Sequence, residues 1–135
     1  MSGYSGTPLW KKLGIKPGSL VCVSNAPTGY DAWVSPLPEG VSVVSRADKR
    51  SCDIVHLFVN SFAALDRELG RARLLMRSNG AIWVSWPKKS AKIPTDVDEN
   101  RIRSLALQGD LVDVKVCAVT EVWSGLKLVV RTHLR

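Results

Sequence analysis

The chain has 135 residues, of which 45% are hydrophobic and 23% charged, and it carries a formal net charge of +7. These values exclude a disordered chain and predict a single folded domain over residues 1–135. The excess positive charge favours anionic partners without choosing among them, and no apolar run is long enough to cross a bilayer.

The N-terminal sequence and the cysteines bear on where the protein is located. The N-terminal stretch MSGYSGTPLWKK lacks the apolar core of a signal peptide, so a cytoplasmic protein is expected. The chain has three cysteines, Cys22, Cys52 and Cys117. They are odd in number and far apart, and they lie within or beside apolar runs. They are interpreted as reduced, buried residues rather than as disulfide partners or metal ligands.

The first half of the chain predicts short elements. Thr7 is expected to cap a short helix with Pro8 at its first position, and Gly14 lies just past the end of that helix. The next elements are a strand over 20–23, the loop NAPTGY at 25–30, a helical turn over 30–34 and a second strand over 41–44.

A third strand and a clear amphipathic helix follow. Residues 53–59, DIVHLFV, form an almost uninterrupted apolar run, which is typical of a strand covered on both faces. Asn60 or Ser61 is expected to cap the helix, and Asn79-Gly80 is expected to end it. The predicted inner face of this helix consists of Phe62, Leu65, Leu69, Ala72 and Met76.

The stretch 81–96, AIWVSWPKKSAKIPTD, predicts a buried strand that runs into a basic loop. Ile82, Val84 and Trp86 alternate with Trp83 and Ser85, so the two sets should point to opposite faces of the sheet. A proline cannot donate to a strand ladder, so the strand should end at position 87. Three lysines should then lie in the loop that follows: Lys88, Lys89 and Lys92.

The remaining sequence predicts one more helix and a hairpin. Thr95 or Asp96 is expected to cap the helix, and Gly109 to end it. Strands over 111–119 and 126–130 should then pair antiparallel through a turn at Trp123-Ser124-Gly125.

This order of elements predicts an α/β fold. The sheet should be open, mostly parallel and Rossmann-like, with a C-terminal antiparallel hairpin strand. The connection between residues 44 and 53 is too short for a crossover helix. Either it is a bare, extended crossover or the second strand is antiparallel, and the extended crossover is preferred.

Two resemblances follow from these residues. The succession from DIVHLFV at 53–59 through NGAIWVSWP to LVDVKVCAV and LKLVV resembles the second half of the class I S-adenosylmethionine-dependent methyltransferases. YSGTPLWKKLGIKPG, NAPTGY, WVSWPKKS, LVDVKVCAV and WSGLKLV resemble a small bacterial family known only as a domain of unknown function. The first resemblance implies a methyltransferase-like fold that is truncated here, and the second implies no chemistry.

The methyltransferase resemblance also implies where a cofactor would bind. That fold has a glycine-rich turn after its first strand and an acidic residue after its second. Here the turn is NAPTGY, with one glycine and a proline that lacks an N–H group, and the second strand is followed by Ser45-Arg46, with Asp48 further along the loop. Binding of S-adenosylmethionine is therefore doubtful. A non-catalytic binding or regulatory module is expected, with a working S-adenosylmethionine-dependent methyltransferase as one alternative.

A second alternative is an anion- or nucleotide-binding protein. Its candidate site combines the 25–30 turn with the 87–92 lysine loop, where backbone N–H groups and ammonium groups could hold a phosphate or carboxylate. The candidate residues are Asn25, Thr28, Gly29, Tyr30, Lys88 and Lys89. A solvated lysine loop without a ligand is the plainer explanation of the same residues.

No catalytic residue or metal site is predicted. The sequence lacks CxxC, HExxH, GxGxxG and GK[ST] patterns, and His56 is interpreted as a core residue with satisfied hydrogen bonds. The five tryptophans are expected to pack helices on the sheet, so nucleic acid is an unlikely partner. A second copy of the chain or another protein is the expected partner, through apolar surface left uncovered by the missing crossover helix.

Overall fold

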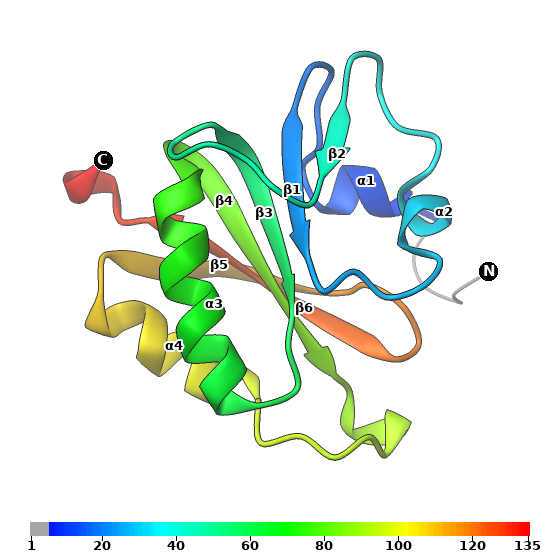
Figure 1. Ribbon diagram of the computed structural model, residues 1–135. Coiled ribbons are helices and arrows are strands. Elements are labelled where there is room, and N and C mark those ends of the chain that lie inside the picture. The colour runs from blue at the N-terminus through cyan, green and yellow to red at the C-terminus, as the bar shows by residue number, and fades with distance from the viewer. Residues whose placement is uncertain (1–5) are drawn as a thin grey trace.

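The computed structural model describes residues 6–135 as a twisted sheet with helices on both faces (Figure 1). The sheet has six strands in the order β2-β1-β3-β4-β6-β5. The strands are β1 (Leu20–Ser24), β2 (Ser42–Val44), β3 (Cys52–Phe58), β4 (Met76–Pro87), β5 (Leu111–Ala118) and β6 (Trp123–Val130). The helices are α1 (Leu9–Lys12), α2 (Tyr30–Val34), α3 (Phe62–Leu75) and α4 (Glu99–Gln108), with short 3-10 turns η1 (Lys89–Ala91) and η2 (Thr132–Leu134).

The predicted strand directions are confirmed. β1 pairs in parallel with both β2 and β3, and β3 pairs in parallel with β4, while β6 runs antiparallel to β4 and β5. The chain passes from β2 to β3 without a helix, as the preferred extended crossover required. The last residues of this β2–β3 connection are held by α3, because the N–H groups of Arg50 and Ser51 donate to the carbonyls of Leu74 and Leu75.

Two apolar clusters hold the layers together, one on each face of the sheet. Ile82, Val84 and Trp86 of β4 pack with α3 and α4, whereas Trp83 packs with the α1 and α2 side, as the alternation predicted. Trp83 also donates its indole N–H to the carbonyl oxygen of Leu13 at 2.9 Å. That bond attaches the end of α1 to the centre of the sheet.

The end of α3 differs from the prediction. The helix stops at Leu75 and β4 begins at once with Met76, so Asn79-Gly80 lies inside the strand. Cys52 pairs with Met76 and Ile54 with Ala81, so β4 bulges between these pairs. At Gly80 a side chain would lie 2.8 Å from the carbonyl oxygen of Asp53, and this close approach explains the glycine.

Two helix starts also lie elsewhere than predicted. Pro8, rather than Thr7, occupies the N-cap position of α1. Asp98 caps α4 by accepting the N–H of Arg101, whereas the Asp96 carboxylate accepts the N–H of Phe62 at 2.7 Å and so serves α3. The other residue proposed as the cap, Thr95, only accepts the N–H of Val97.

The hairpin is antiparallel as predicted, but its turn lies earlier. Trp123 to Gly125 already belong to β6. The turn is closed by Thr120, whose hydroxyl oxygen accepts the N–H groups of Val122 and Trp123, both at 3.1 Å. A threonine hydroxyl can make this turn without glycine, which is why the Ser-Gly signal was misleading.

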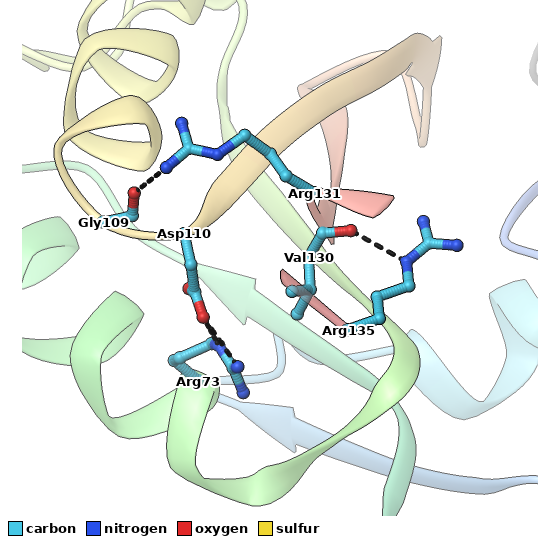
Figure 2. A network of polar contacts seen from close by, with 6 residues as sticks. All are labelled: Arg73, Gly109, Asp110, Val130, Arg131 and Arg135. Carbon is cyan, nitrogen blue, oxygen red and sulfur yellow. Dashed lines mark hydrogen bonds and ion pairs between the residues drawn. The ribbon is translucent and has the colours of Figure 1, made fainter. Parts of the chain in front are cut away.

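Polar contacts of arginines fasten the ends of the last strands, as Figure 2 shows. Arg73 of α3 makes a bidentate pair with Asp110 just before β5, with Nε–Oδ1 and Nη2–Oδ2 distances of 3.0 and 2.7 Å. Arg131 donates to the carbonyl of Gly109, and Arg135 donates to that of Val130.

Within residues 6–135, no helix combines the length and apolar character of a membrane span.

Candidate ligand site at the carboxyl edge of the sheet

The carboxyl ends of β1, β2, β3 and β4 meet at one edge of the sheet, because these four strands are parallel. In open α/β sheets ligands bind outside this edge. The loop after β1, the residues after β2 and the loop after β4 therefore define the candidate site.

The loop after β1 is a tight turn with two residues in the left-handed region. Asn25 has φ +58° and Gly29 has φ +95°. A side chain at position 29 would lie 3.2 Å from the indole nitrogen of Trp33, so both the backbone and the space require glycine there. The side chains of Asn25 and Thr28 are exposed, and the Asn25 amide lies 3.5 Å from the carbonyl oxygen of Phe58.

Tyr30 points away from this edge into the core. It is 3% exposed, and its hydroxyl lies 2.8 Å from Nδ1 of His56. Nε2 of His56 lies 2.8 Å from the hydroxyl of Ser85, so both ring nitrogens have partners, as predicted for a satisfied core histidine. Burial lowers the pKa of His56 to about 3 and raises the pKa of Tyr30, so both side chains stay neutral near pH 7.

The lysine loop starts beyond the turn after β1. Ser24, the last residue of β1, aligns with Leu57 on β3, and Leu57 aligns with Val84 on β4. Lys88 follows Val84 by four residues, so it lies four residues further along the strand direction than the end of β1. At about 3.3 Å per residue this is roughly 13 Å along the strand direction. Figure 1 shows η1, which begins at Lys89, at the far end of β4 and away from the loop after β1.

The structure thus divides the predicted site residues into two groups. Asn25, Thr28 and Gly29 form one turn, and Lys88 and Lys89 lie in a separate loop of the same edge. A single phosphate is too small to contact both groups. An extended ligand could reach from one to the other.

Glu68 is an acidic residue of this edge that sequence reasoning missed. Its Oε1 accepts the hydroxyl of Ser24, the last residue of β1, at 2.5 Å. Arg71 and Arg67 lie 3.5 and 3.7 Å from its carboxylate oxygens, and the side chain is 12% exposed. The sequence shows only that Glu68 is an acid next to the apolar stripe of α3. That position does not distinguish a side chain that points inward from one on the surface.

The residues at this edge do not fit S-adenosylmethionine. That cofactor carries a positive sulfonium and needs an acid after the second strand for its ribose hydroxyls. The residues directly after β2 are Ser45 and Arg46, both exposed, and Asp48 lies two residues further along, next to Lys49 and Arg50. The acid at the end of β1, Glu68, is already engaged. The loop after β4 adds Lys88, Lys89 and Lys92. Among residues 6–135, no group of three His, Cys, Asp or Glu side chains is arranged to hold a metal ion.

Solved structures show which class of fold this sheet belongs to. The chain matches solved structures of S-adenosylmethionine-dependent methyltransferases over most of its length, so it has a methyltransferase-like, Rossmann-like fold. No family model and no curated protein sequence matches the chain.

Three of these structures illustrate the likeness. A Sulfolobus solfataricus protein assigned to the type 11 methyltransferases has a TM-score of 0.65 and 16% identity, covering 92% of this chain and 90% of its own. A SAM-dependent methyltransferase from Aquifex aeolicus has a TM-score of 0.64 and 11% identity, with coverages of 91% and 88%. The B. subtilis tRNA methyltransferase TrmK has a TM-score of 0.62 and 9% identity, with coverages of 97% and 68%. At these identities the likeness establishes the fold alone.

Proposed function

We propose that this protein is a non-catalytic binding module that holds an extended anionic ligand, such as a nucleotide, at the carboxyl edge of a methyltransferase-like sheet. The observation that carries the proposal is the charge of that edge. Arg46 follows β2 where the fold's cofactor would need an acid, and three lysines follow β4. An anion is attracted by this arrangement, whereas a sulfonium cation is repelled.

The backbone of the turn after β1 supports the same reading. Pro27 removes one N–H donor from the turn, and the single glycine, Gly29, lies against Trp33 instead of leaving open space. This turn therefore suits poorly a cofactor that must lie close to the backbone over several residues. A ligand held mainly by side-chain cations has no such requirement.

The β2 edge gives less support to the expected protein-partner surface. Val43 and Val44 of β2 are half-buried and pack against the two core clusters. The large apolar side chains that are exposed among residues 6–135 belong to other segments: Leu74, Ile93, Leu107, Val114, Val116 and Leu134. A small-ligand role therefore has more support than a dimer formed through the β2 edge. Membership of the small bacterial family of unknown function is part of the same proposal.

A thermal-shift panel of adenine nucleotides, coenzyme A, sugar phosphates and S-adenosylmethionine tests the proposal. A ligand that binds only the folded chain raises the melting temperature by mass action, and we expect this from an extended phosphorylated ligand. The double variant Lys88→Met/Lys89→Met should abolish the shift. The matched control, Lys11→Met, changes an exposed lysine on α1 and should leave the shift intact.

The panel contradicts the proposal if no phosphorylated compound raises the melting temperature. It also contradicts the proposal if the double variant keeps the full shift, because the lysines would then play no part in binding.

A working S-adenosylmethionine-dependent methyltransferase is the second candidate, and the shared fold with such enzymes favours it. It requires that S-adenosylmethionine bind measurably despite Arg46 and the lysine loop. It also requires Asp48 or another residue to hold the ribose, because Glu68 is paired with Ser24 and two arginines.

A further inference from the structure

We infer that a phosphate group binds in a cavity at the amino end of the sheet, between the α1–β1 connection and strands β4 and β6, held by Lys16, Lys115 and Lys127. This site lies at the edge opposite the carboxyl ends of the parallel strands. It is therefore independent of the proposed function above.

The cavity has a volume of about 310 Å³. The α1–β1 connection contributes Gly14 and Lys16, the amino ends of β3 and β4 contribute Asp53 and Asn79, and β6 contributes Lys127. This volume is at the lower end of the range for small-molecule pockets, about 300–1,000 Å³. A small group such as phosphate fits it, and a nucleic-acid duplex does not.

Lys127 extends from the sheet on the α1 side. Its neighbours Leu126 and Leu128 are buried in the cluster under α3 and α4, so the side chain of residue 127 points to the opposite face. There it reaches the α1–β1 connection, because a side chain built at Gly14 would lie 3.9 Å from the Lys127 ammonium. The Lys127 side chain is thus placed between β6 and the α1–β1 connection.

Two more lysines are placed near Lys127 by the sheet register and the cavity wall. Lys115 of β5 lies directly across the antiparallel ladder from Lys127, and Lys16 lines the same cavity. Like charges directly opposite each other on neighbouring strands destabilise a sheet. Burial, followed by the charges of Lys115 and Lys16, lowers the pKa of Lys127.

The protein supplies little negative charge to offset these lysines. Among residues 6–135, none of the three lies within 4.0 Å of a carboxylate in an ion pair. Asp53, the one acid of the cavity wall, accepts the N–H of Leu20 at 2.8 Å and lies 3.7 Å from Arg77. The cluster is therefore a concentration of positive charge that an anion would stabilise.

Lysine geometry and charge favour phosphate over other anions. Three flexible ammonium groups act as point charges around a compact centre, which suits a phosphate dianion better than the planar, bidentate recognition typical of arginine and carboxylate. Free phosphate and the phosphate of a small ester share this chemistry.

Isothermal titration calorimetry with inorganic phosphate tests the site. The titrations use the full chain in a phosphate-free buffer at constant ionic strength. We expect saturable 1:1 binding, and we expect Lys127→Met to weaken it about tenfold or more, because a charge-assisted contact is lost. Lys115→Met should weaken binding as well, and it keeps the test decisive if Lys127→Met does not fold.

Two controls separate this site from the carboxyl edge and from other ligands. Lys88→Met/Lys89→Met should leave phosphate binding unchanged, since those lysines lie at the opposite edge. A nucleoside monophosphate that competes with phosphate would identify an ester as the ligand, and no competition would identify free phosphate; both outcomes support the site.

Three results would overturn the inference. The first is the absence of saturable phosphate binding to the wild-type chain. The second is unchanged binding in both Lys127→Met and Lys115→Met. The third is tighter binding of a short single-stranded RNA than of phosphate, with a steep salt dependence, because that would make the cluster a nucleic-acid surface.

Discussion

At the scale of single residues, His56 shows how the sheet tolerates a polar group at its centre. The ring is fully buried, and its two nitrogens face the hydroxyls of Tyr30 and Ser85 at 2.8 Å each. A neutral imidazole donates from one nitrogen and accepts at the other, so these two hydroxyls satisfy it. An apolar run with one histidine predicted a core residue, but the partners come from α2 and β4 and could not be read from the sequence around position 56.

This arrangement predicts a loss of stability in acid. The pKa of His56 is about 3 in the folded chain and 6.5 in the unfolded chain, so only the unfolded chain gains a proton as the pH falls below 6.5. The free energy of unfolding should fall between pH 6.5 and pH 3, by up to about 5 kcal/mol from this group, and no further below pH 3. Above pH 6.5 the group should have no effect.

Urea denaturation of the wild-type chain and of His56→Gln across pH 7 to 4 measures this effect. The slope attributable to His56 should vanish in the variant. NMR provides a second measurement: the ring signals of His56 should stay constant from pH 8 to pH 5. A ring that titrates near pH 6 would contradict the buried, neutral assignment.

The positions of the candidate-site residues could be predicted from the sequence to different degrees. Gly29 was predicted to lie in the 25–30 turn, and the structure places it there with φ +95°. Tyr30, the next residue, was expected to line the site and instead belongs to the core. The spacing of a loop does not reveal which of its side chains turn inward, because that depends on the cavity offered by the opposite strands.

At the scale of elements, strand and helix positions were predictable and their ends were not. The alternation in β4 and the three-to-four-residue spacing in α3 are local signals, and both predicted the inner faces correctly, except that Met76 is buried as the first residue of β4 and not as part of the helix. Ser61 caps α3 locally, as the sequence allowed, by accepting the N–H of Ala64, but a second acceptor for this helix start is distant in sequence. Asp96 binds the first N–H of α3 from the loop before α4, at a separation of 34 residues.

This cap predicts that the loop after β4 stabilises α3. Asp96→Ala should lower the free energy of unfolding by about 1 kcal/mol, because the N–H of Phe62 loses its carboxylate partner. Amide hydrogen exchange should accelerate in the first turn of α3 and remain unchanged at the start of α4, which Asp98 caps. Denaturant titration measures the first effect, and exchange mass spectrometry measures the second.

Asp98→Ala serves as the matched comparison for Asp96→Ala. It should accelerate exchange at the start of α4 and leave α3 unchanged. If Asp96→Ala instead affected α4, the aspartate would serve the helix that the sequence assigned to it.

At the scale of the whole molecule, the topology explains why the fold was predictable and its use was not. Alternating strands and helices with a final hairpin permit few arrangements, and the strand order β2-β1-β3-β4-β6-β5 is among them. Function depends on which side chains line the carboxyl edge. There the distance between the turn after β1 and the lysine loop follows from the strand register, which the sequence does not display.

The molecule also has two separate basic regions. The carboxyl edge has Arg46 and the lysine loop, and the cavity at the amino end has Lys16 and Lys127, with Lys115 across the ladder from Lys127. The net charge of +7 is thus partly concentrated at two places on the sheet, where it bears on binding. This separation allows each region to be altered without the other.

The most direct test of the central claim is calorimetric titration of the wild-type chain with S-adenosylmethionine, with S-adenosylhomocysteine as the uncharged-sulfur comparison. A basic edge, at which Glu68 is already paired and Asp48 lies beyond Arg46, predicts no saturable binding of S-adenosylmethionine up to millimolar concentration. Binding in the micromolar range, abolished by substitutions in the turn after β1 such as Gly29→Val, would contradict the claim and establish the cofactor site of a methyltransferase.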